Sequence, residues 1–304
     1  MKRLLLTLLL AMPLLVSAKT DIDRIDIVAV RDNTALMQLA GRIENQLQQS
    51  RPGVAINIRD SRDYRNKAAA STLVITIGDS SLPWLREHRD DFAAAIAFHV
   101  SSTQFDARSL HAQHVTALYR DQPLARQLRL AKLLLPNLRR VTLLSGTDEP
   151  GIDIDGLQQN SGVGIAVVNT DKDPDWLKSL SQALRNSDAL LGIDDPDVYN
   201  GNTIRGILLT TYRHGKGLIG PSRVFVGAGS LASCYTTSNQ YLQQLASMVK
   251  TVLASKRLPP AQYPQEYHVA INKQVANSLN VPIPDEDTLS ARLHDHTGDC
   301  GDGC

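Results

Sequence analysis

Short apolar runs alternate along this chain with longer segments in which apolar residues recur every three or four positions. Residues 24–30 (RIDIVAV), 54–58, 73–77 and 94–100 read as β-strands by this pattern. The run 73–77 is apolar at almost every position, which is typical of a strand covered on both faces of its sheet. The first half of the chain therefore predicts a buried sheet.

Helical spacing separates these runs. Residues 35–49 place five apolar side chains on one helical face, and 122–135 carries leucines at helical spacing up to Pro136. Further on, the sequence predicts a helix over 175–185 and three more strands, at 140–144, 164–168 and 189–193. Regular alternation of strand and helix is typical of parallel sheets flanked by helices. The predicted fold class is α/β.

Composition narrows the functional classes. The 304 residues carry a net charge of +1 and no long run of Lys or Arg, so we expect no nucleic-acid partner. The sequence has no G-x-S-x-G, H-E-x-x-H or C-x-x-C motif. We therefore expect a protein that is not an enzyme and needs no cofactor.

The first residues have the pattern of an export signal. Lys2 and Arg3 precede an apolar run over 4–16, and small residues at 17–18 suit a cleavage site. The run is too short for a membrane span, although an uncleaved N-terminal anchor is the alternative. We expect residues 1–18 to be a cleaved signal peptide and the rest, 286 residues (304 minus 18), to form two modest domains or one large one.

Residues 221–289 predict a strand, a turn of small residues, a long helix, a proline-marked link, a strand and a short helix. Their order resembles the C-terminal part of the substrate-binding proteins of ABC transporters, whose better-known members bind aromatic amino acids. The matching positions are Gly229, Leu231, Ala232, Ser233, Asn272, Ala276, Leu279 and Pro284. A second stretch, QLRLAKLLLPN at 127–137, resembles the family's crossover between lobes.

This resemblance implies a two-lobed fold of the periplasmic-binding-protein type I kind, with a hinge and a ligand between the lobes. Lobe 1 would comprise 19–117 and about 223–258, lobe 2 would comprise 118–222 and about 259–290, and 291–304 would form a flexible tail. The implied function is capture of a small molecule in the periplasm, by family default an amino acid, for an ABC permease in the inner membrane. The alternative is a sensor or adaptor of the same fold that signals to a membrane partner.

Four turns are the candidate ligand contacts, because ligands of open α/β sheets lie beyond the carboxyl ends of strands, near helix N-termini. Their residues are Gly78, Asp79, Ser80 and Ser81; His99, Ser101 and Ser102; Asp194 and Asp195, with Tyr199 and Asn202 nearby; and Gly227, Gly229 and Ser230. The alternative for the aspartates is helix capping, and for His99 a structural role. Asp79 departs from the family pattern, since a carboxylate there would repel an anionic ligand group.

The tail holds residues that commonly bind soft or borderline metals. They are His294, His296, Cys300 and Cys304. Metal capture by this tail is one hypothesis, and a disulfide between the two cysteines of a disordered tail is the other. Cys234, in a run of small residues, is expected to be a buried thiol.

Overall fold

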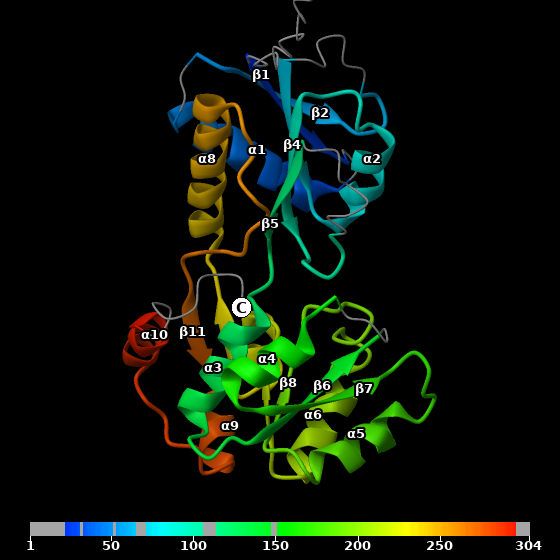
Figure 1. The fold of residues 1–304 in the computed structure, drawn as a ribbon, viewed down its shortest axis with the longest axis vertical. Coiled ribbons are helices and arrows are strands. Elements are labelled where there is room, and N and C mark those ends of the chain that lie inside the picture. The colour runs from blue at the N-terminus through cyan, green and yellow to red at the C-terminus, as the bar shows by residue number, and fades with distance from the viewer. Residues whose placement is uncertain are drawn as a thin grey trace, which may run out of the picture.

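The computed structural model describes residues 22–30, 33–50, 53–64, 71–105, 114–146 and 151–295. They form two α/β lobes, one above the other along the long axis of the molecule (Figure 1). The predicted fold class is confirmed. The predicted signal peptide, 1–18, lies outside the described residues. Within the described ranges, no helix combines the length and apolar character that crossing a membrane requires.

Lobe 1 is built on a parallel sheet of five strands in the order β2-β1-β3-β4-β5. The strands are β1 (Arg24–Ala29), β2 (Ala55–Asp60), β3 (Thr72–Ile77), β4 (Ala94–Val100) and β5 (Val115–Tyr119). Helices α1 (Thr34–Ser50) and α8 (Ser238–Ser255) cover one face, and α2 (Leu82–Glu87) packs on the other. Every residue of β3 is buried, as its almost entirely apolar pattern predicts.

Lobe 2 has a six-stranded sheet in the order β11-β10-β9-β8-β6-β7, in which β11 alone is antiparallel to its neighbour. The strands are β6 (Arg140–Ser145), β7 (Gly164–Asn169), β8 (Ala189–Leu191), β9 (Gly217–Ile219), β10 (Ala232–Tyr235) and β11 (His268–Ile271). One face packs against α3 (Leu124–Leu134), α4 (Ile154–Ser161), α9 (Lys273–Ser278) and α10 (Glu286–Asp295). The other packs against α5 (Trp176–Leu184), α6 (Ile204–Arg213) and α7 (Arg223–Ala228).

Three chain segments connect the lobes: the link from β5 to α3, the link from β10 to α8, and residues 256–267 (Figure 1). The boundary expected at 223 differs from the structure, because α7 and β10 belong to lobe 2 and only α8 returns to lobe 1. The strand predicted just after Pro221 is also wrong: this stretch is the helix α7. An apolar run this short has too few turns for periodicity to separate a helix from a strand.

Gln127 joins α3 to the sheet of lobe 2 at the base of the hinge. Its side chain is almost wholly buried, and its amide nitrogen donates to the carbonyl of Gly220 at 3.2 Å and lies 3.5 Å from Ser233 Oγ. Its amide oxygen accepts from the backbone N–H of Cys234 at 3.1 Å. One buried side chain thus satisfies backbone groups of two neighbouring strands, where an unpaired group would be costly.

We predict that Gln127→Ala lowers the free energy of unfolding by about 2–3 kcal/mol, because buried backbone groups lose their partner and a cavity is left. Urea unfolding followed by circular dichroism measures the change. The matched control is Gln159→Ala on the exposed face of α4, expected within about 0.5 kcal/mol of the parent protein. Equal midpoints for the two variants would show that the Gln127 contacts are dispensable.

Candidate ligand-binding cleft

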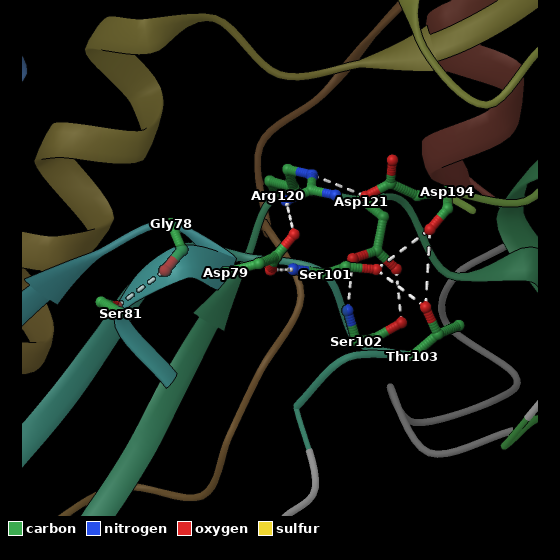
Figure 2. A network of polar contacts seen from close by, with 9 residues as sticks. All are labelled: Gly78, Asp79, Ser81, Ser101, Ser102, Thr103, Arg120, Asp121 and Asp194. Carbon is green, nitrogen blue, oxygen red and sulfur yellow. Dashed lines mark hydrogen bonds and ion pairs between the residues drawn. The ribbon is translucent and has the colours of Figure 1, made fainter. Parts of the chain in front are cut away.

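A polar cluster lies where the two lobes meet (Figure 2). Asp79 comes from the 3-10 turn after β3, Ser101 directly follows β4, Arg120 directly follows β5, and Asp194 lies beyond β8 in the other lobe. Parallel strands bring their carboxyl ends to the same edge of a sheet, so residues far apart in sequence converge there. Of the four predicted turns, three therefore contribute to one place.

Arg120 lies between the two carboxylates of this cluster. Its guanidinium forms an ion pair with Asp79 through Nη1 and another with Asp194, 2.7 Å from Nε to Oδ2. All three side chains are about three-quarters buried. Burial raises the pKa of Asp194 even though the charge of Arg120 opposes that shift. The single positive charge is thus shared by one carboxylate from each lobe.

Neutral hydrogen bonds join the lobes at the same point. The buried Ser101 donates its hydroxyl to the carbonyl of Asp194 in lobe 2 at 3.1 Å, while its backbone N–H donates to the Asp79 carboxylate within lobe 1, at 2.7 Å to Oδ1. The Thr103 hydroxyl lies 3.5 Å from the same carbonyl (Figure 2). These contacts place the end of β4 in lobe 1 directly against the loop after β8 in lobe 2.

Asp121, the next residue after Arg120, is held by Ser102 and takes no part in the ion pairs of Arg120 with Asp79 and Asp194. Its carboxylate accepts two hydrogen bonds from Ser102, from the backbone N–H at 2.8 Å and from the hydroxyl at 2.5 Å. The side chain is 8% exposed, and burial raises the pKa of this carboxyl to about 6, although the Ser102 hydrogen bonds lower it. A buried carboxylate with a perturbed pKa in a cleft is a frequent mark of a functional site.

A cavity of about 1010 Å³ opens between the lobes beside this cluster. Its walls come from lobe 1 and the hinge, through residues 102, 103, 105, 119, 121–123 and 259–263, and from lobe 2, through residues 124–125, 151–153 and 192–194. Asp121 and Asp194 both line it. The size falls at the upper end of the range for small-molecule sites, which favour such junctions between domains.

The other predicted residues of the first two turns have structural contacts. Ser81 donates its hydroxyl to the carbonyl of Gly78 at 2.7 Å, and Ser80 is exposed. The His99 ring lies 5.1 Å from the ring of Tyr241, and burial first, then Arg120, lowers the pKa of His99 to about 4. A neutral imidazole packed in this way fits the structural alternative.

The third turn is divided between two roles. Asp194 joins the cluster, whereas Asp195 accepts hydrogen bonds from the backbone N–H groups of Gly146 at 2.9 Å and Asp197 at 3.0 Å. Asp195 thus orders its own loop and the end of β6. Tyr199 is buried in the core of lobe 2, and Asn202 is exposed.

The fourth turn is not at the cavity. Gly227 is exposed near the end of α7, the carbonyl of Gly229 accepts from the Tyr212 hydroxyl at 3.4 Å, and Ser230 is fully buried. None of the three lines the cavity. The physical reason is topological: the turn follows a helix and leads into β10, so it lies at the amino end of that strand rather than at the carboxyl end of another.

The described part of the tail does not assemble a metal site. His294 stacks on the ring of Tyr267, with centroids 3.9 Å apart, and its Nε2 lies 3.2 Å from the Tyr267 carbonyl oxygen. Among the described residues, no group of three His, Cys, Asp or Glu side chains is placed to hold a metal. His296, Cys300 and Cys304 lie outside those residues. Cys234 is buried, and burial raises the pKa of its thiol to about 12.

Sequence analysis missed Arg120 and Asp121, the two charged residues at the centre of the cleft. The available signal was the Tyr-Arg-Asp order at 119–121, where polar residues directly follow the short apolar run of β5. It also missed Tyr263, whose ring reaches Tyr119 only because residues 259–263 run back beside β5. No local pattern marks that return.

No protein-family model and no curated protein matches this chain. Several solved structures are similar to it. One is a substrate-binding protein with adhesive properties from Clostridium difficile, in its ligand-free open form (TM-score 0.64, 11% identity, 88% of this chain and 98% of that chain). A second is an ABC domain in complex with L-Trp from Streptococcus pneumonia (TM-score 0.58, 16% identity, 88% of this chain and 98% of that chain). A third is a conserved domain protein from Vibrio cholerae (TM-score 0.58, 17% identity, 88% of this chain and 97% of that chain).

This likeness confirms the fold that the sequence resemblance implies. The chain has the two-lobed fold of type I periplasmic substrate-binding proteins, over nearly the whole length of the similar structures. Identities of 11–17% show the fold and leave the ligand open.

The buried carboxylate of Asp121 generates a prediction about stability. Its folded pKa, about 6, exceeds its usual value of 3.8, so the folded state binds more protons between these values and loses stability as pH rises through them. We predict that Asp121→Asn is more stable than the parent protein by about 3 kcal/mol at pH 7.5, and that this difference shrinks towards pH 4.

Urea unfolding at a series of pH values measures this difference. Asp90→Asn, which neutralises an exposed aspartate, is the matched control and should stay within about 0.5 kcal/mol of the parent protein. A stability difference for Asp121→Asn that stays constant from pH 4 to pH 7.5 would contradict the raised pKa.

Proposed function

We propose that this protein captures a small molecule between its two lobes, as a periplasmic binding protein that serves an ABC importer. One observation carries the proposal: a single cavity is lined by polar groups from both lobes and from the hinge between them. Asp194 belongs to lobe 2, whereas Ser102 and Asp121 belong to lobe 1 and the hinge. A molecule that contacts all three favours the closed arrangement of the lobes.

The hinge gives a physical basis for such closure. The lobes are joined by three short chain segments and by a few polar contacts around Arg120, so small changes in backbone angles there suffice to rotate one lobe against the other. A ligand shifts this equilibrium only through contacts that one arrangement offers and the other lacks. A cavity whose walls come from both lobes provides them.

The chemistry of the walls supports binding rather than catalysis. The described lining residues include no histidine, cysteine or lysine, which are the side chains most often used as a nucleophile or as the base beside a serine, and the Ser102 hydroxyl donates to the Asp121 carboxylate. Export through the signal peptide at 1–18 and delivery to an inner-membrane ABC permease complete the proposal. A membrane sensor protein in place of the permease remains the alternative partner.

We predict that at least one compound in a screen of amino acids, amines, sugars, organic acids and nucleosides raises the melting temperature. At a hundredfold excess over the dissociation constant the stabilisation is about 2.7 kcal/mol, which raises the melting temperature by roughly 4–5 °C for a chain of this size. Differential scanning fluorimetry measures the shift. Tyr263→Ala should reduce it by removing part of the cavity wall, and Asp90→Asn should leave it unchanged.

The screen has a clear negative result. If no compound of any class shifts the melting temperature, capture of a small molecule is the wrong function for this cavity. A shift that is the same in the parent protein and in Tyr263→Ala would place the binding elsewhere on the molecule.

A further inference from the structure

We propose that the ligand of this cavity carries a positive charge, and that an ammonium group, either a protonated amine or a quaternary ammonium, lies against Asp121 and the rings of Tyr119 and Tyr263. The inference rests on the proposed function and names the class of molecule for the same site. It differs from the amino-acid default, in which a free carboxylate must also be held.

The charges of the cavity favour a cation. The described lining residues include three aspartates, Asp121, Asp153 and Asp194, and no lysine, arginine or histidine. Arg120 stands nearby, but its charge is shared by Asp79 and Asp194, and these three groups sum to −1 (+1 −1 −1). A cleft lined by one sign of charge attracts the opposite sign and repels a carboxylate or phosphate.

Asp121 is the carboxylate that lacks a counter-ion. Asp79 and Asp194 share Arg120, whereas the recorded partners of Asp121 are the backbone N–H and the hydroxyl of Ser102. In the described ranges no lysine, arginine or histidine pairs with it. A buried carboxylate without a counter-ion is expensive even when it is hydrogen-bonded, and a ligand ammonium would supply the missing charge.

An aromatic wall stands beside this carboxylate. The rings of Tyr119 and Tyr263 meet edge to face with centroids 4.9 Å apart, and Phe105 lies 5.8 Å from Tyr119. All three line the cavity. Burial, then Tyr263 and then the charge of Asp121, raises the pKa of the Tyr119 hydroxyl to about 12, and burial followed by the charge of Asp121 raises the pKa of Tyr263. These rings therefore stay neutral.

Aromatic faces around a carboxylate are the combination that recognises ammonium groups. A cation near the face of a tyrosine ring is attracted by the negative face of the ring, more strongly when water is excluded. The carboxylate adds the charge–charge attraction and, for a primary amine, a hydrogen bond. A neutral polar molecule can still donate a hydrogen bond to the carboxylate, but it gains neither the cation–π nor the charge–charge attraction.

Isothermal titration calorimetry at pH 8, where Asp121 is ionised, tests the charge with two matched sets of probes. The first set is putrescine, 1,4-butanediol and succinate. The second is choline, 3,3-dimethyl-1-butanol and 3,3-dimethylbutanoate. Each set keeps the size of the molecule and changes its charge from positive to neutral to negative. We expect at least one cation to bind at least tenfold more tightly than its neutral counterpart, and no anion to bind.

Two variants locate the binding. Asp121→Asn keeps the shape and removes the charge, and should weaken binding of the cation at least tenfold. Because this variant is expected to be more stable than the parent protein, unfolding does not account for a loss of binding. Tyr263→Ala should weaken binding as well, and Asp90→Asn, which removes an exposed charge, should not.

The outcomes separate this inference from the proposed function. Tighter binding of a neutral or anionic probe, or a hit without a cationic group in the wider screen, overturns the cationic class and leaves small-molecule capture standing. Unchanged affinity of Asp121→Asn for a bound cation overturns the assignment to Asp121. No binding by any probe or screened compound overturns both.

Discussion

The junction of the lobes depends on how the charge of one guanidinium is divided. Arg120 follows β5 directly and contacts Asp79 of lobe 1 and Asp194 of lobe 2. Without it, two partly buried carboxylates would face each other across the cleft, and charges removed from water are tolerated only when they are paired. A planar guanidinium with donors on several nitrogens suits this double role better than a lysine ammonium.

The sharing of the Arg120 charge between two aspartates also explains which ligand charge the cavity favours. Because Arg120 is committed to two aspartates, it does not offer a free positive charge to a ligand carboxylate. The Asp79 position, which departs from the pattern of the resembling family, thus becomes part of an internal ion-pair network. The likeness in fold therefore says little about the ligand, which the side chains at the junction decide.

Burying the Asp121 carboxylate lowers the stability of the folded protein, and the fold itself does not require this residue to be charged. A carboxylate buried with a raised pKa destabilises the folded protein near neutral pH, and a neutral side chain of the same shape would not. Binding sites often keep groups that are unfavourable until the ligand arrives. The aromatic rings beside it and its position at the junction of the two lobes are consistent with such a site.

The sequence by itself determined the α/β class and most elements of both sheets. The apolar run of β3 and the leucine spacing of α3 report directly which residues are buried, because strand and helix periodicities depend only on neighbours along the chain. The tertiary structure alone decided three matters: that α7 is a helix, that Gly229 lies away from the cleft, and that Arg120 meets Asp194. These depend on which strands pair and where three separate segments cross between the lobes, and such contacts between distant residues leave no periodic trace in the chain.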